Sequence, residues 1–171
     1  MTDTQKKPLW KNELVWLFLL TSGLFAILYS KFILGGYAYV FTDTGADTMQ
    51  INYAQYGLFS SLFRSGESGY VLQAGLGMDV SSYYPAYLIP YNLLILLAPQ
   101  RLLPWAVLAS AYLKMITISL VGYLFYRKLM QDGIGTMAAA LAWTFSGYVI
   151  LWGQHYGFCT CMALFTVFMY F

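Results

Sequence analysis

Residues 14–34 read LVWLFLLTSGLFAILYSKFIL, and Lys31 is the only charged residue in this run. A helix of about 20 apolar residues crosses the roughly 30 Å hydrocarbon core of a bilayer, so the run predicts a transmembrane helix. The polar leader before it, residues 1–13, carries three lysines, which predict a cytoplasmic N-terminus by the positive-inside rule. Secretory signal peptides have a shorter apolar region and then a small-residue cleavage site, so we expect an uncleaved first span.

The composition of the whole chain also indicates a membrane protein. Of its 171 residues, 60% are hydrophobic and 9% are charged, whereas roughly a quarter of the residues in a soluble domain are charged. Lipid is therefore expected to be its main solvent. The formal net charge is +2 and the basic residues are scattered, which excludes nucleic acid as a partner. Cys159 and Cys161 flank a single residue, which is too close for an unstrained disulfide.

More of the chain is apolar enough to enter a membrane. Residues 104–126 predict a full span that carries Lys114, and residues 134–152 predict another. An apolar run at 158–171 is expected to begin a further span that continues beyond Phe171. The predicted fold class is an all-α integral membrane protein, a polytopic bundle of transmembrane helices.

Residues 84–98 are apolar but short, and prolines interrupt them. A spanning helix needs about 20 residues, so this segment is expected either to cross with a kink or tilt, or to enter the membrane and return. If it crosses, Arg127 and Lys128 lie outside; if it returns, they lie inside. The positive-inside rule favours the second arrangement, and the sidedness of residues 127–133 and 153–157 stays open at this point.

Residues 35–83 form the longest polar segment and are expected to be the first outer loop. Within it, apolar and aromatic side chains recur at helical spacing over about 47–64, which predicts an amphipathic helix lying on the membrane surface. These side chains are Met49, Tyr53, Tyr56, Phe59 and Phe63. Asp47 stands at the N-cap position, with Gln50 where a capping box places its second residue.

Two carboxylates, Asp43 and Asp47, lie between the first span and this helix. One interpretation is a general base held at the boundary between lipid and water. The alternative is structural: Asp47 caps the helix and Asp43 is solvated. The two interpretations are compatible, because a cap also fixes the direction of its carboxylate.

Lys114 is the other candidate for chemistry, because an ammonium inside a membrane span costs several kcal/mol unless it is paired or faces water. It either lines a polar cavity or contacts a lipid phosphate, or it lies closer to the helix end and snorkels to the surface. His155, Cys159 and Cys161 lack the paired spacing of a structural zinc site. They are interpreted as a membrane-edge histidine and two small apolar side chains.

The order of these features resembles the N-terminal region of the bacterial YfhO family of large multi-spanning membrane proteins. The features that carry the resemblance are the basic leader and first span, Asp43-x-x-x-Asp47-Thr with a tyrosine-rich helix after it, Gly75-Leu-Gly77, Tyr83-Tyr84-Pro85, and a lysine-bearing span that ends Tyr126-Arg-Lys-Leu. That family is in turn similar to the GT-C class of glycosyltransferases. The resemblance covers nearly all of the chain.

The resemblance implies a reaction and a location. A sugar would pass from a polyprenyl-phosphate donor to a cell-envelope polymer, the acceptor, on the outer face of the bacterial cytoplasmic membrane. The chain would be embedded in membrane lipid. No organic cofactor is implied, and a divalent metal is left open. Because the family's proteins are longer, this chain would be an N-terminal portion that is inactive alone.

Site residues follow from the same resemblance, because an acidic residue in the first outer loop is the catalytic base of GT-C enzymes. That residue would be Asp47, with Asp43 as the second choice. For substrate binding, Lys114 or Arg64 would contact the lipid phosphate, and Tyr53 and Tyr84 are the further candidate substrate-binding residues.

Two other classes of function stay open from the residues alone. One is a segment of a transporter or channel, in which Lys114 and the proline-interrupted stretch 84–98 would line a substrate path. The other is a membrane scaffold without catalytic activity. Substrate uptake that depends on Lys114 would favour the transporter, whereas envelope glycosylation that depends on Asp47 would favour the transferase.

Overall fold

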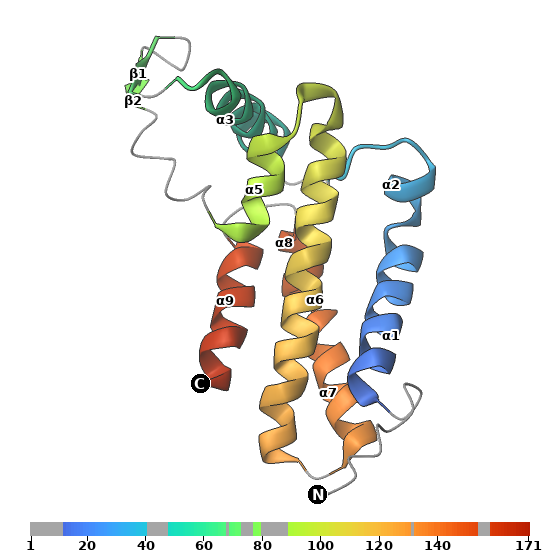
Figure 1. Ribbon diagram of the computed structural model, residues 1–171. Helices are drawn as coiled ribbons and strands as arrows, with labels where there is room; N and C mark the ends of the chain where they lie inside the picture. Colours follow the sequence, from blue (N-terminus) through green and yellow to red (C-terminus); the bar gives the residue numbers. More distant parts are fainter. Residues whose placement is uncertain are drawn as a thin grey trace, which may run out of the picture.

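The computed structural model shows a mostly helical chain (Figure 1). It describes residues 12–40, 48–67, 69–72, 77–79, 89–130, 132–153 and 158–171. The helices of these stretches are α1 (Glu13–Leu28), α2 (Ser30–Leu34), the π-helical turn η2 (Thr48–Tyr53), α3 (Ala54–Ser65), α5 (Pro90–Leu97), the 3-10 turn η4 (Gln100–Leu102), α6 (Leu103–Leu129), α7 (Gly133–Thr144), α8 (Gly147–Trp152) and α9 (Phe158–Tyr170). Two short antiparallel strands also occur there, β1 (Tyr70–Val71) and β2 (Met78–Asp79).

The long helix α6 is the centre of the fold, and α1, α5, α7 and α9 all pack against it (Figure 1). With η4 it forms a helical stretch, Gln100–Leu129, of 30 residues, which contains the span expected at 104–126. At about 1.5 Å per residue this stretch is roughly 45 Å long, more than the hydrocarbon core of a bilayer. Within the described stretches it is the one helix long and apolar enough to span a membrane, by length and composition. The apolar helices Glu13–Leu28 and Cys159–Tyr170 are shorter.

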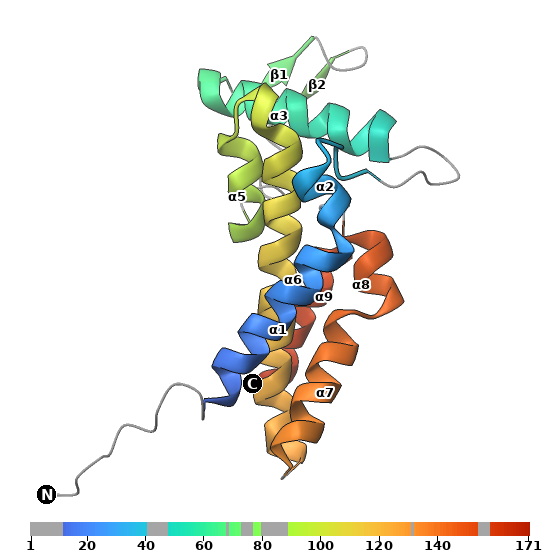
Figure 2. The ribbon, with the colours of Figure 1, turned by 90° about the vertical axis from the view of Figure 1, so that its right-hand side faces the viewer.

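The bundle has two ends, which we call the α3 end and the Glu13 end. Helix α3 lies crosswise over the first of them (Figure 2). At the other end the Tyr123 hydroxyl, near the end of α6, donates a hydrogen bond to the Glu13 carboxylate. The same carboxylate lies against Gly133 at the start of α7. Lys128 donates to the Tyr170 carbonyl and so joins the last turns of α6 and α9.

Helix α5 covers the C-terminal half of segment 84–98 and runs toward the α3 end. It has 8 residues, and about 12 Å of helix does not cross a bilayer. Its C-terminal end lies at α3, because the Ser60 hydroxyl donates to the Ala98 carbonyl at 2.5 Å. Helix α6 starts at the same end and runs to the Glu13 end. Arg127 and Lys128 therefore lie on the side of the bundle where α1 begins.

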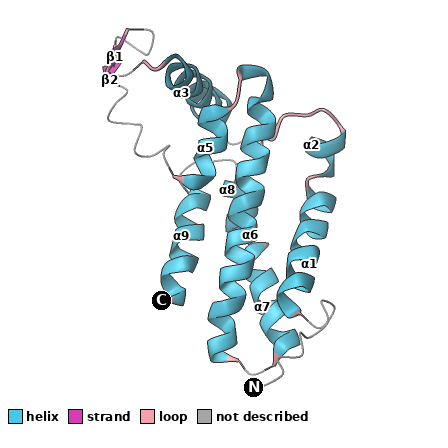
Figure 3. Ribbon diagram, in the orientation of Figure 1, coloured by secondary structure: helices cyan, strands magenta, loops and turns pink. Residues whose placement is uncertain are grey.

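Two predicted spans are divided in the structure (Figure 3). The continuous helix expected over 14–34 is α1 followed by α2, with a turn at Tyr29 whose ring stacks on Phe25 at 4.4 Å between centroids. The helix expected over 134–152 is α7 followed by α8. Before that division the Thr144 hydroxyl donates to the carbonyl four residues earlier at 2.7 Å, a bond that often bends helices.

The amphipathic helix expected at about 47–64 is present as η2 continued by α3. It ends at Gly66, whose φ of 72° is typical of a left-handed C-cap. The apolar face of α3 packs on α5. Tyr56 and Phe59 are the large side chains of this face, 1% and 0% exposed. Asp47, the expected N-cap, lies outside the described residues.

Small polar side chains join α1 to α6. The Thr21 and Ser119 hydroxyls lie 2.7 Å apart, and both side chains are fully buried. The Ser22 and Tyr112 hydroxyls lie 2.8 Å apart. In a membrane a bond of this kind contributes about 0.6 kcal/mol, so it selects the pairing of two helices more than it stabilises the bundle.

Candidate functional site at the α3 end

Two hydrogen bonds fasten α3 to the end of the bundle. The Gln100 amide of η4 donates to the Gly57 carbonyl at 2.7 Å, and the Ser60 hydroxyl donates to the Ala98 carbonyl. A Cβ atom at Gly57 would lie 3.2 Å from the Gln100 side chain, so glycine allows this close approach. The helical segment that these bonds hold begins with η2 at Thr48, the residue after Asp47. The bonds therefore fix the position of this segment along the axis of α6.

Three tyrosines from separate elements meet beside this attachment. The Tyr53 hydroxyl donates to the Tyr39 carbonyl at 2.9 Å. The Tyr39 ring meets the Tyr29 ring edge-on at 5.2 Å between centroids. Burial raises the pKa of the Tyr39 hydroxyl, an effect to which Tyr29 adds, and burial also raises the pKa of the Tyr53 hydroxyl. Both hydroxyls are therefore protonated at neutral pH and remain hydrogen-bond donors.

A cavity of about 230 Å³ lies next to the tyrosines, against the first turns of α6. Its described walls come from α2, from the loop after α2, from η4 and from α6. Phe32 and Leu108 form an apolar part of its lining. Tyr37 and Trp105 add aromatic rings that carry a hydroxyl and an indole N–H. Among the described residues that line it, Arg101 is the one charged side chain. We call this the Arg101 cavity.

Lys114 lies inside the bundle, where 2% of its surface is exposed. Met115 and Ile118 of the same helix are buried with it. Cys159 of α9 is also buried, and no residue of the described stretches makes a hydrogen bond or ion pair with the Lys114 ammonium. The burial excludes snorkelling to the helix end. Lys114 is 13 residues along the helix from Arg101, roughly 20 Å away.

Replacement of Lys114 by methionine is expected to raise the thermal unfolding midpoint. Methionine keeps the length of the side chain and removes a buried charge, whose burial costs several kcal/mol unless it is paired. A gain of about 1 kcal/mol would raise the midpoint by about 2–4 °C, which fluorescence scanning of the detergent-purified protein measures. Lys31→Met, at an exposed lysine of α2, is the control and should shift it less. A lower midpoint for Lys114→Met would contradict the expectation.

The structure separates the predicted site residues that it describes. Tyr53 belongs to the tyrosine cluster, next to the Arg101 cavity. Arg64 is exposed near the end of α3, where its Nε donates to the Ser60 carbonyl at 3.3 Å. Neither Arg64 nor Lys114 lines the Arg101 cavity. The remaining predicted residues lie outside the described stretches: Asp43, Asp47 and Tyr84.

Arg101 and Tyr39 were not among the predicted site residues. Arg101 lies between Pro99 and Pro104, just before the longest apolar span. An arginine at the end of a span lies at headgroup depth, and this is the signal that points to it. Tyr39 has no comparable signal, because it is one of many tyrosines in the N-terminal half of the chain.

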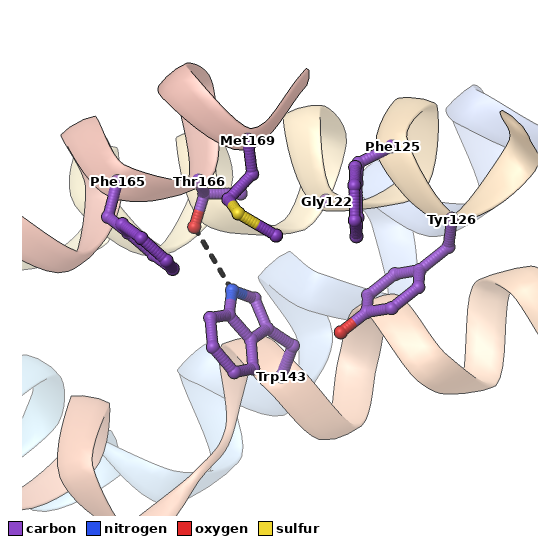
Figure 4. A pocket seen from close by; sticks show the side chains of 7 residues that line it. All are labelled: Gly122, Phe125, Tyr126, Trp143, Phe165, Thr166 and Met169. Atoms are coloured by element: carbon purple, nitrogen blue, oxygen red, sulfur yellow. Dashed lines mark hydrogen bonds between the residues drawn. The ribbon is translucent and has the colours of Figure 1, made fainter. Parts of the chain in front are cut away.

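A second cavity, of about 160 Å³, lies between α6, α7 and α9 toward the Glu13 end (Figure 4). Much of its lining is apolar and comes from Phe125, Phe165 and Met169. The Trp143 indole donates to the Thr166 hydroxyl at 3.0 Å, so these two polar groups are already paired. This cavity suits a hydrocarbon chain and offers little to a reacting group.

No protein-family model, no curated protein and no solved structure matches this chain.

Proposed function

We propose that this chain is the N-terminal part of a GT-C-like membrane glycosyltransferase. The reaction would move a sugar from a polyprenyl-phosphate donor to a cell-envelope acceptor. The attachment of α3 carries the proposal: the helix that begins directly after Asp47 is hydrogen-bonded to η4 and to the end of α5. A sugar tethered to a membrane lipid is reached only at the bilayer surface, so a base for this reaction has to be held at a constant depth.

The proposal includes a polytopic bundle with the α3 end outside and the Glu13 end in the cytoplasm. Large apolar side chains face outward along several helices, for example Ile27 at 71% and Phe168 at 79% exposure, and lipid is the solvent that suits them. Arg127 and Lys128 lie at the same end as the start of α1. With the three lysines of the leader that precedes α1, that end has the basic excess of a cytoplasmic face.

Asp47 would act as the general base in an inverting displacement. The acceptor hydroxyl oxygen forms a bond to the anomeric carbon of the sugar, and its proton passes to the Asp47 carboxylate. The bond between that carbon and the phosphate oxygen breaks, and the lipid phosphate leaves with the electron pair. A cationic side chain would stabilise the charge that develops on the leaving phosphate. Asp43 is the second choice for the base.

The burial of Lys114 favours a second candidate, a segment of a transporter. An ammonium in the middle of a membrane helix is a common mark of a substrate or ion path. In that case Lys114→Met would abolish substrate uptake into vesicles and leave the envelope polymers unchanged. The transferase proposal predicts instead that substitution of Asp47 changes the envelope polymers and leaves substrate uptake intact.

Deletion of the gene in the bacterium that carries it tests the transferase proposal. We expect a sugar substituent to disappear from an envelope polymer and the polyprenyl-phosphate sugar to accumulate, because the donor is made but not consumed. Mass spectrometry of isolated envelope polymers and of extracted lipids measures both. Complementation with the intact gene should restore them. Polymers identical in the deletion and parent strains would refute the proposal.

A further inference from the structure

We propose that the Arg101 cavity binds the phosphate group of an anionic membrane lipid, with Arg101 as the phosphate ligand. This deepens the proposed function, because it assigns the lipid phosphate to a cavity that neither Lys114 nor Arg64 lines. It rests on the membrane placement in that function, with the α3 end at the bilayer surface, and it does not depend on the transfer reaction.

The charge of the cavity selects an anion. Arg101 is exposed and is the one charged side chain among the described lining residues. Within the described stretches its guanidinium makes no hydrogen bond or ion pair that would already occupy it. A planar guanidinium donates two parallel hydrogen bonds to a phosphate, so arginine is the side chain best suited to this group.

The backbone that carries Arg101 is held in place before any ligand arrives. The preceding residue, Gln100, is hydrogen-bonded to Gly57 of α3. The following residue, Leu102, donates its backbone N–H to the Pro99 carbonyl at 2.8 Å. Little ordering of this turn is needed on binding, and a preorganised site loses less entropy when it binds.

The cavity has an aromatic wall that suits a lipid headgroup and an apolar wall that suits the start of a hydrocarbon chain. Trp105 and Tyr37, 47% and 68% exposed, stand at the same end as Arg101, and these residue types gather where headgroups meet hydrocarbon. Leu108 lies one turn deeper along α6 and continues the wall with an apolar surface. A phosphate at Arg101 would thus be followed by the start of a hydrocarbon chain along Leu108.

The size of the cavity excludes a larger phosphate compound. Pockets for drug-sized ligands have volumes of about 300–1,000 Å³. The Arg101 cavity has about 230 Å³, which is room for a phosphate and its immediate substituent but not for a whole nucleotide sugar. The ligand is therefore a lipid phosphate of which only the start of the hydrocarbon chain lies in the cavity, or free phosphate.

Lipid titration of the detergent-purified chain tests the proposal. The probes are short-chain phosphatidic acid, phosphatidylcholine of the same chain length, and inorganic phosphate. Binding is followed by the change in tryptophan fluorescence that disappears in Trp105→Phe. We expect phosphatidic acid to bind, phosphatidylcholine to give no change, and inorganic phosphate to bind at least tenfold more weakly than phosphatidic acid.

Arg101→Gln should weaken the binding of phosphatidic acid at least tenfold. Arg127→Gln is the matched control, since Arg127 is an exposed arginine at the Glu13 end that does not line the cavity. It should bind like the unmodified protein, and both variants should keep the circular dichroism spectrum. Equal affinity of Arg101→Gln and the unmodified protein would overturn the site. Equal affinity for inorganic phosphate and phosphatidic acid would overturn the assignment to a lipid.

Failure of this proposal and of the proposed function can be told apart. Lipid binding that depends on Arg101, in a protein whose deletion leaves the envelope polymers unchanged, would refute the transferase and keep the site. A confirmed transferase whose Arg101→Gln variant binds phosphatidic acid normally would refute the site and keep the function.

Discussion

Replacement of Asp47 by alanine, in the protein as its gene encodes it, is expected to lower sugar transfer by about 10²- to 10⁴-fold, the usual contribution of a general base. Alanine cannot accept the proton of the acceptor hydroxyl, so the displacement loses the group that makes the oxygen nucleophilic. The helix that follows Asp47 keeps its attachments through Gly57 and Ser60, so the protein level should be unchanged. Mass spectrometry of the envelope polymers measures transfer, and immunoblotting measures the protein.

The chain offers a matched control for this experiment. Asp79→Ala removes an exposed carboxylate of β2, on the short sheet that lies at the same end as α3 (Figure 2). It should leave transfer intact. Asp43→Ala should have a smaller effect than Asp47→Ala, since Asp43 does not directly precede the attached helix. Normal transfer in both the Asp43 and Asp47 variants would rule out a base at either position.

Replacement of Phe59 by alanine is expected to destabilise the protein by about 3–5 kcal/mol. Phe59 is 0% exposed and belongs to the main apolar core where α3 packs on α5. Deleting the ring leaves a cavity at the contact that holds α3 across the bundle. A loss of this size lowers the unfolding midpoint by about 6–20 °C in a protein of this length. Scanning fluorimetry measures it.

Ile51→Ala is the control for Phe59→Ala, because Ile51 lies on η2 and is 48% exposed. Its substitution should move the midpoint far less. If Phe59→Ala unfolds at the temperature of the unmodified protein, α3 is not held by this contact. The constant depth on which the proposed function depends would then lack its main support.

The parts of the fold that follow from hydropathy are those in which one long apolar run forms one helix. Helix α6 is the example, because nothing in the 104–126 run competes with the helix. The division at Tyr29 could not be predicted in this way, since the residues on both sides are apolar and tyrosine is compatible with a helix. The direction of α5 also needed tertiary contacts. Prolines interrupt the 84–98 run in the sequence, but the bonds from Ser60 to Ala98 and from Gln100 to Gly57 show which end α5 reaches.

The candidate site was predictable where residues lie together in the sequence. Tyr53 lies six residues after Asp47 in the sequence, so one segment was expected to carry both, and of the two the structure describes Tyr53. The Arg101 cavity combines three separate segments, since Tyr37 lies in the loop after α2, Arg101 in η4 and Trp105 in α6. A lone arginine between two apolar segments is ordinary in a membrane protein. Its significance appears only when the folded chain brings aromatic side chains from more than sixty residues away beside it.

The hydrogen bond between Thr21 and Ser119 has a consequence for the synthesis of the protein, because its partners are 98 residues apart. A ribosome that adds about 5–20 residues per second needs roughly 5–20 s to reach the second partner after the first. In the proposed membrane setting α1 spends this interval in lipid without α6, and the Thr21 hydroxyl then bonds to a carbonyl of its own helix. The first helix must therefore be retained by its own hydropathy until the nascent chain reaches Ser119. A nascent chain released before that point would leave α1 as a lone helix, open to the proteases that survey the membrane.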